Sequence, residues 1–126
     1  MSPLKLLSTT RVSIGSGVWL APRFSGRLFG LDPDANPQLP YLGRLFGIRD
    51  VVLAAGAQMS TGADRKLWLR LGLVCDAADA AAGLIAGRNG ELSKLSTALV
   101  TAPALLAIAL GAAALQADDA EPGLTT

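Results

Sequence analysis

The longest apolar segment of the chain runs from Leu95 to Ala117 and contains no charged residue. At about 1.5 Å per helical residue, a segment of this length crosses the roughly 30 Å hydrocarbon core of a bilayer. Charged residues flank it on both sides. The pattern predicts a transmembrane helix, kinked at Pro103, followed by a polar acidic tail over 118–126.

Three earlier apolar segments, over 6–21, 39–60 and 67–87, are interrupted by charged residues. The last of them has Asp76 and Asp79 near its middle. A central Asp costs about 2.5–3.5 kcal/mol on insertion into a bilayer, whereas each Leu or Val returns only about 0.3–0.6 kcal/mol. We therefore expect these segments to be transmembrane helices that depend on one another inside a bundle.

A shorter amphipathic segment over 23–31 has aromatic residues toward one side and arginines toward the other. This arrangement is typical of a helix that lies in the membrane interface. Residues 32–37 form a polar turn by their residue chemistry. The predicted fold is all-α: one domain over 1–126, an integral membrane bundle of about four transmembrane helices plus the short interfacial helix.

Composition agrees with a membrane location. Charged residues make up 17% of the chain, against roughly 25% in soluble domains, and 51% of the residues are hydrophobic although only 5% are aromatic. The apolar excess is therefore in small and aliphatic residues, including 14 glycines. Small residues let helices approach closely inside lipid, where no hydrophobic effect drives them together.

Charge and reactive residues exclude several functions. The net charge is +1 without a basic tract, so nucleic acid binding has no electrostatic basis. The chain has no histidine and a single cysteine, Cys75, which removes the commonest general base and any Cys-rich metal site. The string Asp76-x-x-Asp79 lacks the residues that continue the motif of phosphatidyl transferases. We expect no enzyme activity, catalytic residue, metal or cofactor.

The charged residues inside the apolar segments lie on faces of small residues. Asp76 and Asp79 share a helical stripe with glycines, and Asp50 shares one with glycines and alanines. If 39–60 and 67–87 form a hairpin through a tight turn at residues 62–64, these acids and Arg49 lie at one depth, about 20 Å from the turn. The predicted buried charge cluster consists of Arg44, Arg49, Asp50, Asp76 and Asp79.

Three roles stay open for this cluster: an ion-pair network that orders the helices, a proton or ion path, and a docking point for another membrane subunit. Polar residues inside a membrane mark functional sites by default. Because two arginines neutralise two of three acids, one carboxylate is left over, and we expect it to be Asp79, with Arg44 reaching the cluster from one turn away.

Three strings carry a family resemblance: PRFSGRLFGLDPD at 22–34, RLFGIRD at 44–50 and DAAD at 76–79. Together they resemble a family of small four-helix membrane proteins of unknown function that is common in actinobacteria. The resemblance covers most of residues 10–115. It implies a four-helix membrane domain without an established activity and supplies no catalytic residue.

The expected function is that of a small multi-pass protein of the cytoplasmic membrane, acting as a structural or accessory subunit. Its expected partners are the lipid bilayer and either another membrane protein or a second copy of the chain. The alternative is a proton- or ion-coupled, transporter-like protein that uses the buried Arg/Asp cluster. Basic residues are shared evenly between the two predicted sides, so they give no orientation. One side is expected to hold Lys5, Arg11, Arg65, Lys66 and Arg70, and the other Arg23, Arg27, Arg44, Arg88 and Lys94.

Overall fold

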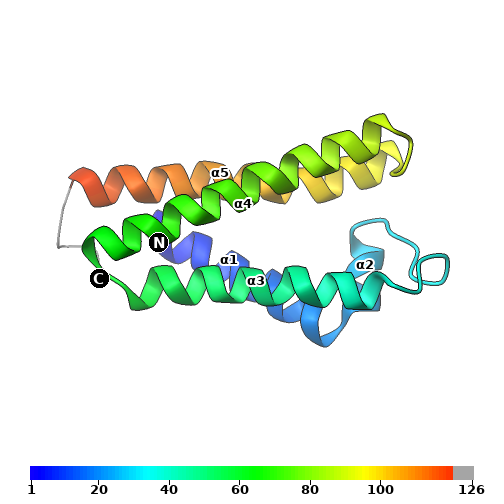
Figure 1. Ribbon diagram of the computed structural model, residues 1–126, viewed down its shortest axis with the longest axis horizontal. Coiled ribbons are helices and arrows are strands. Elements are labelled where there is room, and N and C mark those ends of the chain that lie inside the picture. Colours follow the sequence, from blue (N-terminus) through cyan, green and yellow to red (C-terminus); the bar gives the residue numbers. More distant parts are fainter. Residues whose placement is uncertain (121–126) are drawn as a thin grey trace.

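The computed structural model describes residues 1–120, and within them it is entirely helical (Figure 1). The helices are α1 (Pro3–Leu20), α2 (Pro22–Leu28), α3 (Leu39–Met59), α4 (Gly62–Arg88) and α5 (Lys94–Ala120). The prediction of an all-α chain with four long helices and one short helix is confirmed at the level of secondary structure.

Two helix starts lie earlier than predicted. The backbone N–H of Lys5 donates to the Ser2 hydroxyl at 3.2 Å, and Pro3 follows at the first helical position, so α1 begins three residues before the predicted segment. The predicted turn at residues 62–64 is wrong, because α4 already begins at Gly62. The connection is shorter, at 60–61, and Gly62 takes a φ of +58° that suits glycine.

Glycine also ends two of the helices. After α2, Gly30 adopts a φ of +77° and the Leu31 N–H donates to the Gly26 carbonyl at 2.9 Å. This hydrogen bond closes a turn of six residues, as in the Schellman motif, which satisfies the last carbonyl groups of a helix. Gly90 ends α4 in the same way. At the other terminus α5 continues to Ala120, so the predicted acidic tail begins inside a helix, and its remaining residues, 121–126, lie outside those described.

The helices pack as two antiparallel pairs, α1 with α3 and α4 with α5 (Figure 1). The pairs α1–α5 and α3–α4 have smaller contacts. Although α3 and α4 are joined by a tight turn, they separate along their length, and each packs mainly on a different neighbour. The expectation that these two helices pack as a continuous hairpin is therefore met only near the turn.

The α1–α3 pair is held by direct contact between backbones. A Cβ built on Gly15 would lie 2.5 Å from the Gly47 carbonyl oxygen, and one on Gly47 would lie 2.5 Å from the Gly15 carbonyl oxygen. No side chain fits between the two helices at this crossing. The stripe of small residues predicted on 39–60 is therefore a contact face in this pair.

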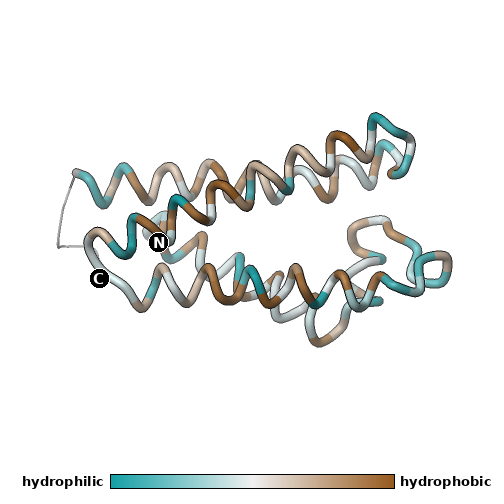
Figure 2. The backbone as a smooth tube through the Cα atoms, in the orientation of Figure 1, coloured by the Kyte–Doolittle hydropathy of each residue, from teal (hydrophilic) through white to brown (hydrophobic). Residues whose placement is uncertain are grey.

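The bundle buries several charged side chains and exposes many large apolar ones. Among the most buried side chains are Arg11, Asp50 and Asp76, at 5%, 6% and 3% exposure, whereas Val74 and Leu95 are each 67% exposed. Apolar residues occur along the whole length of the long helices, and hydrophilic residues gather at the connections 29–38 and 89–93 (Figure 2). The apolar core is a small cluster: Leu4, Leu7, Ala57, Leu69, Ala107 and Ala114.

Within residues 1–120, length and composition single out one helix that could cross a membrane, over Lys94–Asp119, with a mean hydropathy of 2.2. Only 28% of its most apolar window is buried inside the bundle, unlike the core helix of a soluble protein. The other long helices do not meet the same criterion of length and composition.

Candidate functional site

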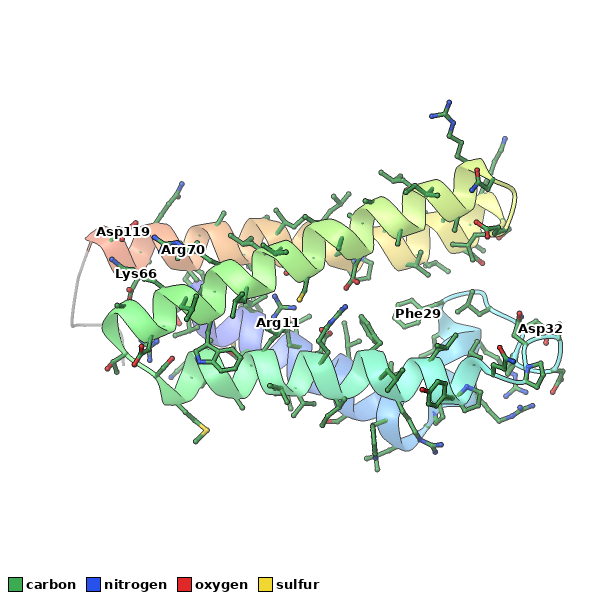
Figure 3. The ribbon with its side chains drawn as sticks, viewed as in Figure 1. Arg11, Phe29, Asp32, Lys66, Arg70 and Asp119 are labelled. Carbon is green, nitrogen blue, oxygen red and sulfur yellow. The ribbon has the colours of Figure 1, made fainter. Side chains whose placement is uncertain are left out.

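The centre of the bundle contains an ion pair between α1 and α4. Both terminal nitrogens of Arg11 donate to Asp76, at 3.0 Å to Oδ1 and 2.6 Å to Oδ2. Bidentate pairing of this kind combines charge with fixed geometry. A Cβ on Gly72 would lie 2.8 Å from Nη2 of Arg11, so the glycine provides the space that the guanidinium occupies. Figure 3 shows Arg11 between the two helix pairs.

A second bidentate pair joins α3 to α4. Arg49 donates from Nη1 to Oδ1 of Asp79 at 3.0 Å, and from Nη2 to Oδ2 of the same carboxylate. This pair is more accessible than the first, since 33% of the Arg49 side chain and 28% of the Asp79 side chain are exposed. The guanidinium carbon also lies 5.0 Å from the centre of the Phe46 ring, a cation–π distance.

Asp50 lies between the two arginines and is the least satisfied of the three acids. Its Oδ1 is 3.6 Å from Nη1 of Arg11 and 3.7 Å from Nη2 of Arg49, too long for hydrogen bonds. This oxygen is buried and accepts no hydrogen bond from the residues described. Arg49 Nε is likewise buried without a hydrogen bond within residues 1–120, although its guanidinium is engaged by Asp79.

We call Arg11, Arg49, Asp50, Asp76 and Asp79 the charged layer. With every group ionised, two guanidinium groups and three carboxylates give +2 − 3 = −1. The layer joins the α1–α3 pair to α4 by side chains, at a level where the helix backbones have moved apart. It is therefore the main polar connection between the two halves of the bundle.

Arg44, the fifth residue of the predicted cluster, is not in the charged layer. It is exposed, and its Nε donates to the Trp19 carbonyl oxygen at 3.1 Å near the end of α1. Five residues of α-helix correspond to a rotation of about 140° beyond one full turn, so Arg44 cannot share the face of Arg49. The prediction that Arg44 reaches Asp79 is wrong for this geometric reason.

Arg11 takes the place predicted for Arg44. The sequence interpretation put Arg11 among the basic residues outside the bilayer, yet it is 5% exposed. A signal was present, because Arg11 lies on one stripe with Leu4, Leu7, Gly15 and Val18, the buried face of α1. The prediction that Asp79 is the unpaired acid is also wrong, because Asp79 is bound by Arg49 and Asp50 is the acid left over.

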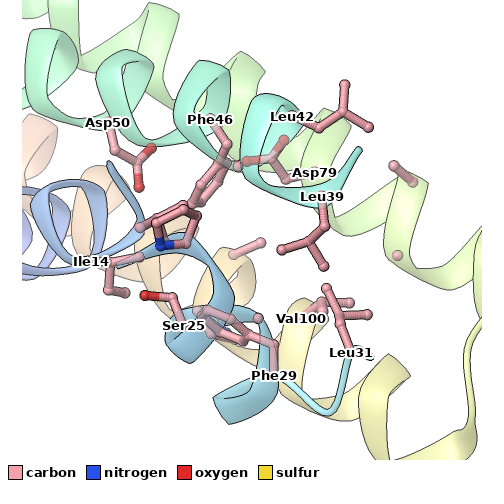
Figure 4. Close-up of a pocket in the computed structure, with 18 of the residues that line it drawn as sticks. Ile14, Ser25, Phe29, Leu31, Leu39, Leu42, Phe46, Asp50, Asp79 and Val100 are labelled. Atoms are coloured by element: carbon pink, nitrogen blue, oxygen red, sulfur yellow. The ribbon is translucent and has the colours of Figure 1, made fainter. Parts of the chain in front are cut away.

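A cavity of about 790 Å³ extends from the charged layer between the two helix pairs toward α2. Asp50, Asp76 and Asp79 line its inner end. Most of its remaining wall is apolar, with Ile14, Phe29, Leu39, Leu42 and Val100 (Figure 4). The size is that of pockets that bind small organic molecules, which are typically about 300–1,000 Å³.

The other reactive groups do not form a site of their own. No three His, Cys, Asp or Glu residues within 1–120 are grouped so as to hold a metal ion. Cys75 is a free, partly buried thiol on α4. The chemistry that the arrangement supports is therefore binding by charge and hydrogen bonds, at the inner end of an apolar cavity.

Comparison with protein-family models, with curated proteins and with solved structures gives no match for this chain. The fold therefore defines the class only broadly: over residues 1–120 the protein is all-helical, with one candidate membrane-spanning helix. The resemblance to the actinobacterial four-helix family stays a prediction that rests on the three strings named above, and no residue role is taken from a relative.

Proposed function

We propose that the chain is a multi-pass protein of the cytoplasmic membrane, in which α1, α3, α4 and α5 each cross the bilayer. The observation that carries the proposal is that Arg and Asp side chains are buried at the centre while many large aliphatic side chains are exposed. Water would favour the opposite distribution, whereas hydrocarbon favours this one.

Helix length supports the proposal as well. At about 1.5 Å per residue, α1 is roughly 27 Å long, α3 roughly 32 Å, and α4 and α5 each roughly 40 Å, against about 30 Å of hydrocarbon. The charges that lower the hydropathy of α3 and α4 include Arg49, Asp50, Asp76 and Asp79, which interact inside the bundle. Insertion of these helices is then cooperative, because each supplies the partner of a charge on another.

Within that membrane class we propose a structural or accessory role for the protein. Its polar groups are mostly paired with one another, and the pairs connect three helices. Such a layer specifies one arrangement of helices, which is what a small subunit that presents a fixed lipid-level surface to a partner requires. Replacing one residue of the charged layer leaves a buried charge without its partner. Other arrangements of the helices are therefore much less stable than this one.

Topology tests the membrane proposal. Four crossings put both termini on one side, which we expect to be the cytoplasm, so reporter fusions at Ser2 and Thr126 should report the same compartment. A fusion within 89–93 should report the same compartment as one within 29–38, and the opposite one from the termini. Termini in different compartments, or loss of the protein to the soluble fraction, would contradict the proposal.

A proton- or ion-coupled role is the second candidate, and Asp50 is the observation that favours it. A carboxylate without a hydrogen bond, at the wall of a cavity and in a layer with a net charge of −1, can take up a proton or cation. Purified protein in liposomes with a pH-sensitive dye inside tests this role. A proton flux above that of empty liposomes, abolished by Asp50→Asn, would support a proton-coupled role. Equal flux in liposomes with and without the protein would contradict that role.

A further inference from the structure

The cavity next to the charged layer is strongly divided in polarity. Its inner end carries the carboxyl groups of Asp50, Asp76 and Asp79 and the guanidinium group of Arg11. Mostly apolar side chains from all five helices line the middle, and the connections at the outer end add the polar Asn36, Gln38 and Glu91. Measured along α3 from Leu39 to Asp50, the cavity is about 16 Å long. A molecule that lies between these two ends must be mainly apolar, with a polar group next to the charged layer.

The charge of the inner end selects the sign of that polar group. The carboxylates of Asp76 and Asp79 already accept two hydrogen bonds each from an arginine, and Asp50 accepts none at Oδ1. Because the layer carries a net charge of −1, an anionic head group would be repelled and a single positive charge would balance it. Oδ1 is enclosed between the two arginines, so a donor in the cavity would reach Asp50 at its other oxygen, Oδ2.

Other occupants of this charge fit less well. A metal ion needs several oxygen, nitrogen or sulfur ligands, and residues 1–120 contain no such group. A free proton would satisfy Asp50 but leave the apolar cavity without an occupant. A lipid tail would fill the cavity without using Asp50.

From these observations we propose that the cavity is a binding site for a lipophilic primary amine, whose ammonium group donates to the Asp50 carboxylate while its apolar part lies between the helix pairs. This site goes beyond an accessory role, and it uses the membrane only as the route by which the amine arrives. The ammonium supplies both the missing charge and a hydrogen-bond donor for Oδ2. A hydrogen bond to a charged group in a water-poor site is the kind that contributes most to binding.

The test uses the purified full chain in nanodiscs of zwitterionic phosphatidylcholine, titrated calorimetrically with n-octylamine at neutral pH. Nanodiscs with Asp50→Asn are the matched control, since partition of the amine into lipid is the same in both. We expect saturable binding of one amine per chain, weakened about 10- to 100-fold by Asp50→Asn. n-Octanol, the uncharged analogue, should bind both proteins equally and more weakly. Equal affinity for the amine in the two proteins would overturn the proposal.

A second pair of variants tests the location without changing any charge. Ala82 lines the cavity and is exposed, so Ala82→Phe should fill the space and abolish amine binding. Ala81 is also exposed but does not line the cavity, and Ala81→Phe should bind normally. Equal binding by these two variants would contradict the site even if Asp50→Asn failed to fold.

The outcome for the membrane proposal is read separately. A chain that does not incorporate into nanodiscs contradicts the membrane location, and the same titration is then made in aqueous buffer. A chain that incorporates but binds the amine no better than Asp50→Asn contradicts the ligand site alone.

Discussion

The two ends of the bundle are built from the same four helices but differ in how those helices meet. At the closed end, near the 60–61 turn, an apolar core of Leu4, Leu7, Ala57, Leu69, Ala107 and Ala114 fills the interior. At the open end, between α2 and the 89–93 turn, a cavity takes the place of a core (Figure 4). The charged layer lies between these ends. The charged layer, whose residues most need partners, therefore separates the packed core from the cavity.

The difference has a simple origin in side-chain size and reach. At the closed end, alanines and a few leucines let the four helices approach, and buried Arg65 adds a bond from its Nε to the Ala57 carbonyl oxygen at 3.0 Å. At the charged layer the connection is made by long arginine side chains, which hold helices together while their backbones stay apart. Beyond that layer no comparable bridge joins α3 to α4 in the residues described, and the cavity opens.

Removing the Arg11–Asp76 ion pair, which lies between the closed and open ends, should have the largest effect on stability. Arg11→Ala leaves Asp76 buried without its partner, and we expect a loss of about 3–5 kcal/mol in the free energy of unfolding. Denaturation in mixed micelles, followed by helical circular dichroism, measures this loss. Arg44→Ala is the matched control, because Arg44 is exposed with one hydrogen bond and should cost about 1 kcal/mol or less. Equal losses would show that the charged layer does not hold the two halves of the bundle together.

A leucine from each end sharpens the comparison. Leu69 is 3% exposed in the closed-end core, and Leu69→Ala should cost about 2–5 kcal/mol through lost contacts and the cavity left behind. Leu42 lines the open-end cavity at 58% exposure, and Leu42→Ala should change stability by about 0.5 kcal/mol or less. The same unfolding measurement applies to both. A large loss for Leu42→Ala would mean that the open end is packed in the folded protein.

Of the three main losses of stability, the smallest is expected at the α1–α3 crossing, whose two helices run through both ends. Gly47→Ala places a methyl group 2.5 Å from the Gly15 carbonyl oxygen, and we expect a loss of about 1–3 kcal/mol as the helices move apart. Gly17→Ala is the control, since its nearest neighbour is the Ser25 hydroxyl oxygen at 3.9 Å, and better helix propensity should stabilise it by up to about 1 kcal/mol. Opposite signs for the two glycines are the expected result. Equal losses of stability for Gly47→Ala and Gly17→Ala would show that the close approach of the two backbones at Gly47 is not what holds α1 and α3 together.

Prediction from the sequence succeeded where a local rule applied. The apolar segments predicted the helices, and the stripes of small residues placed Asp50 and Asp76 on the buried faces of α3 and α4, with Asp79 partly buried. The same rule applied to α1 would include Arg11, which lies one turn before Gly15 on the buried face.

The rest depends on tertiary packing that no local pattern contains. The packing of three helices together decides which acid lacks an arginine. Because α3 and α4 separate along their length, Arg49 reaches Asp79 across the space between them. The cavity is lined by residues from every helix and both open-end connections, so no short segment predicts it. The start of α4 depended on a connection of two residues, shorter than the turn chemistry of 62–64 suggested.

The central claim is that hydrocarbon surrounds the bundle at the level of the charged layer, and a spin label at Val74 tests it most directly. Val74 is 67% exposed and precedes buried Asp76 by two residues on α4. In Val74→Cys on a Cys75→Ser background, reconstituted in bilayers, the label should be relaxed strongly by oxygen and little by a water-soluble nickel chelate. Asn89→Cys on the same background, in the exposed 89–93 turn, should show the reverse. Strong relaxation of the Val74→Cys label by the nickel chelate would mean that water surrounds the charged layer, and it would contradict the account.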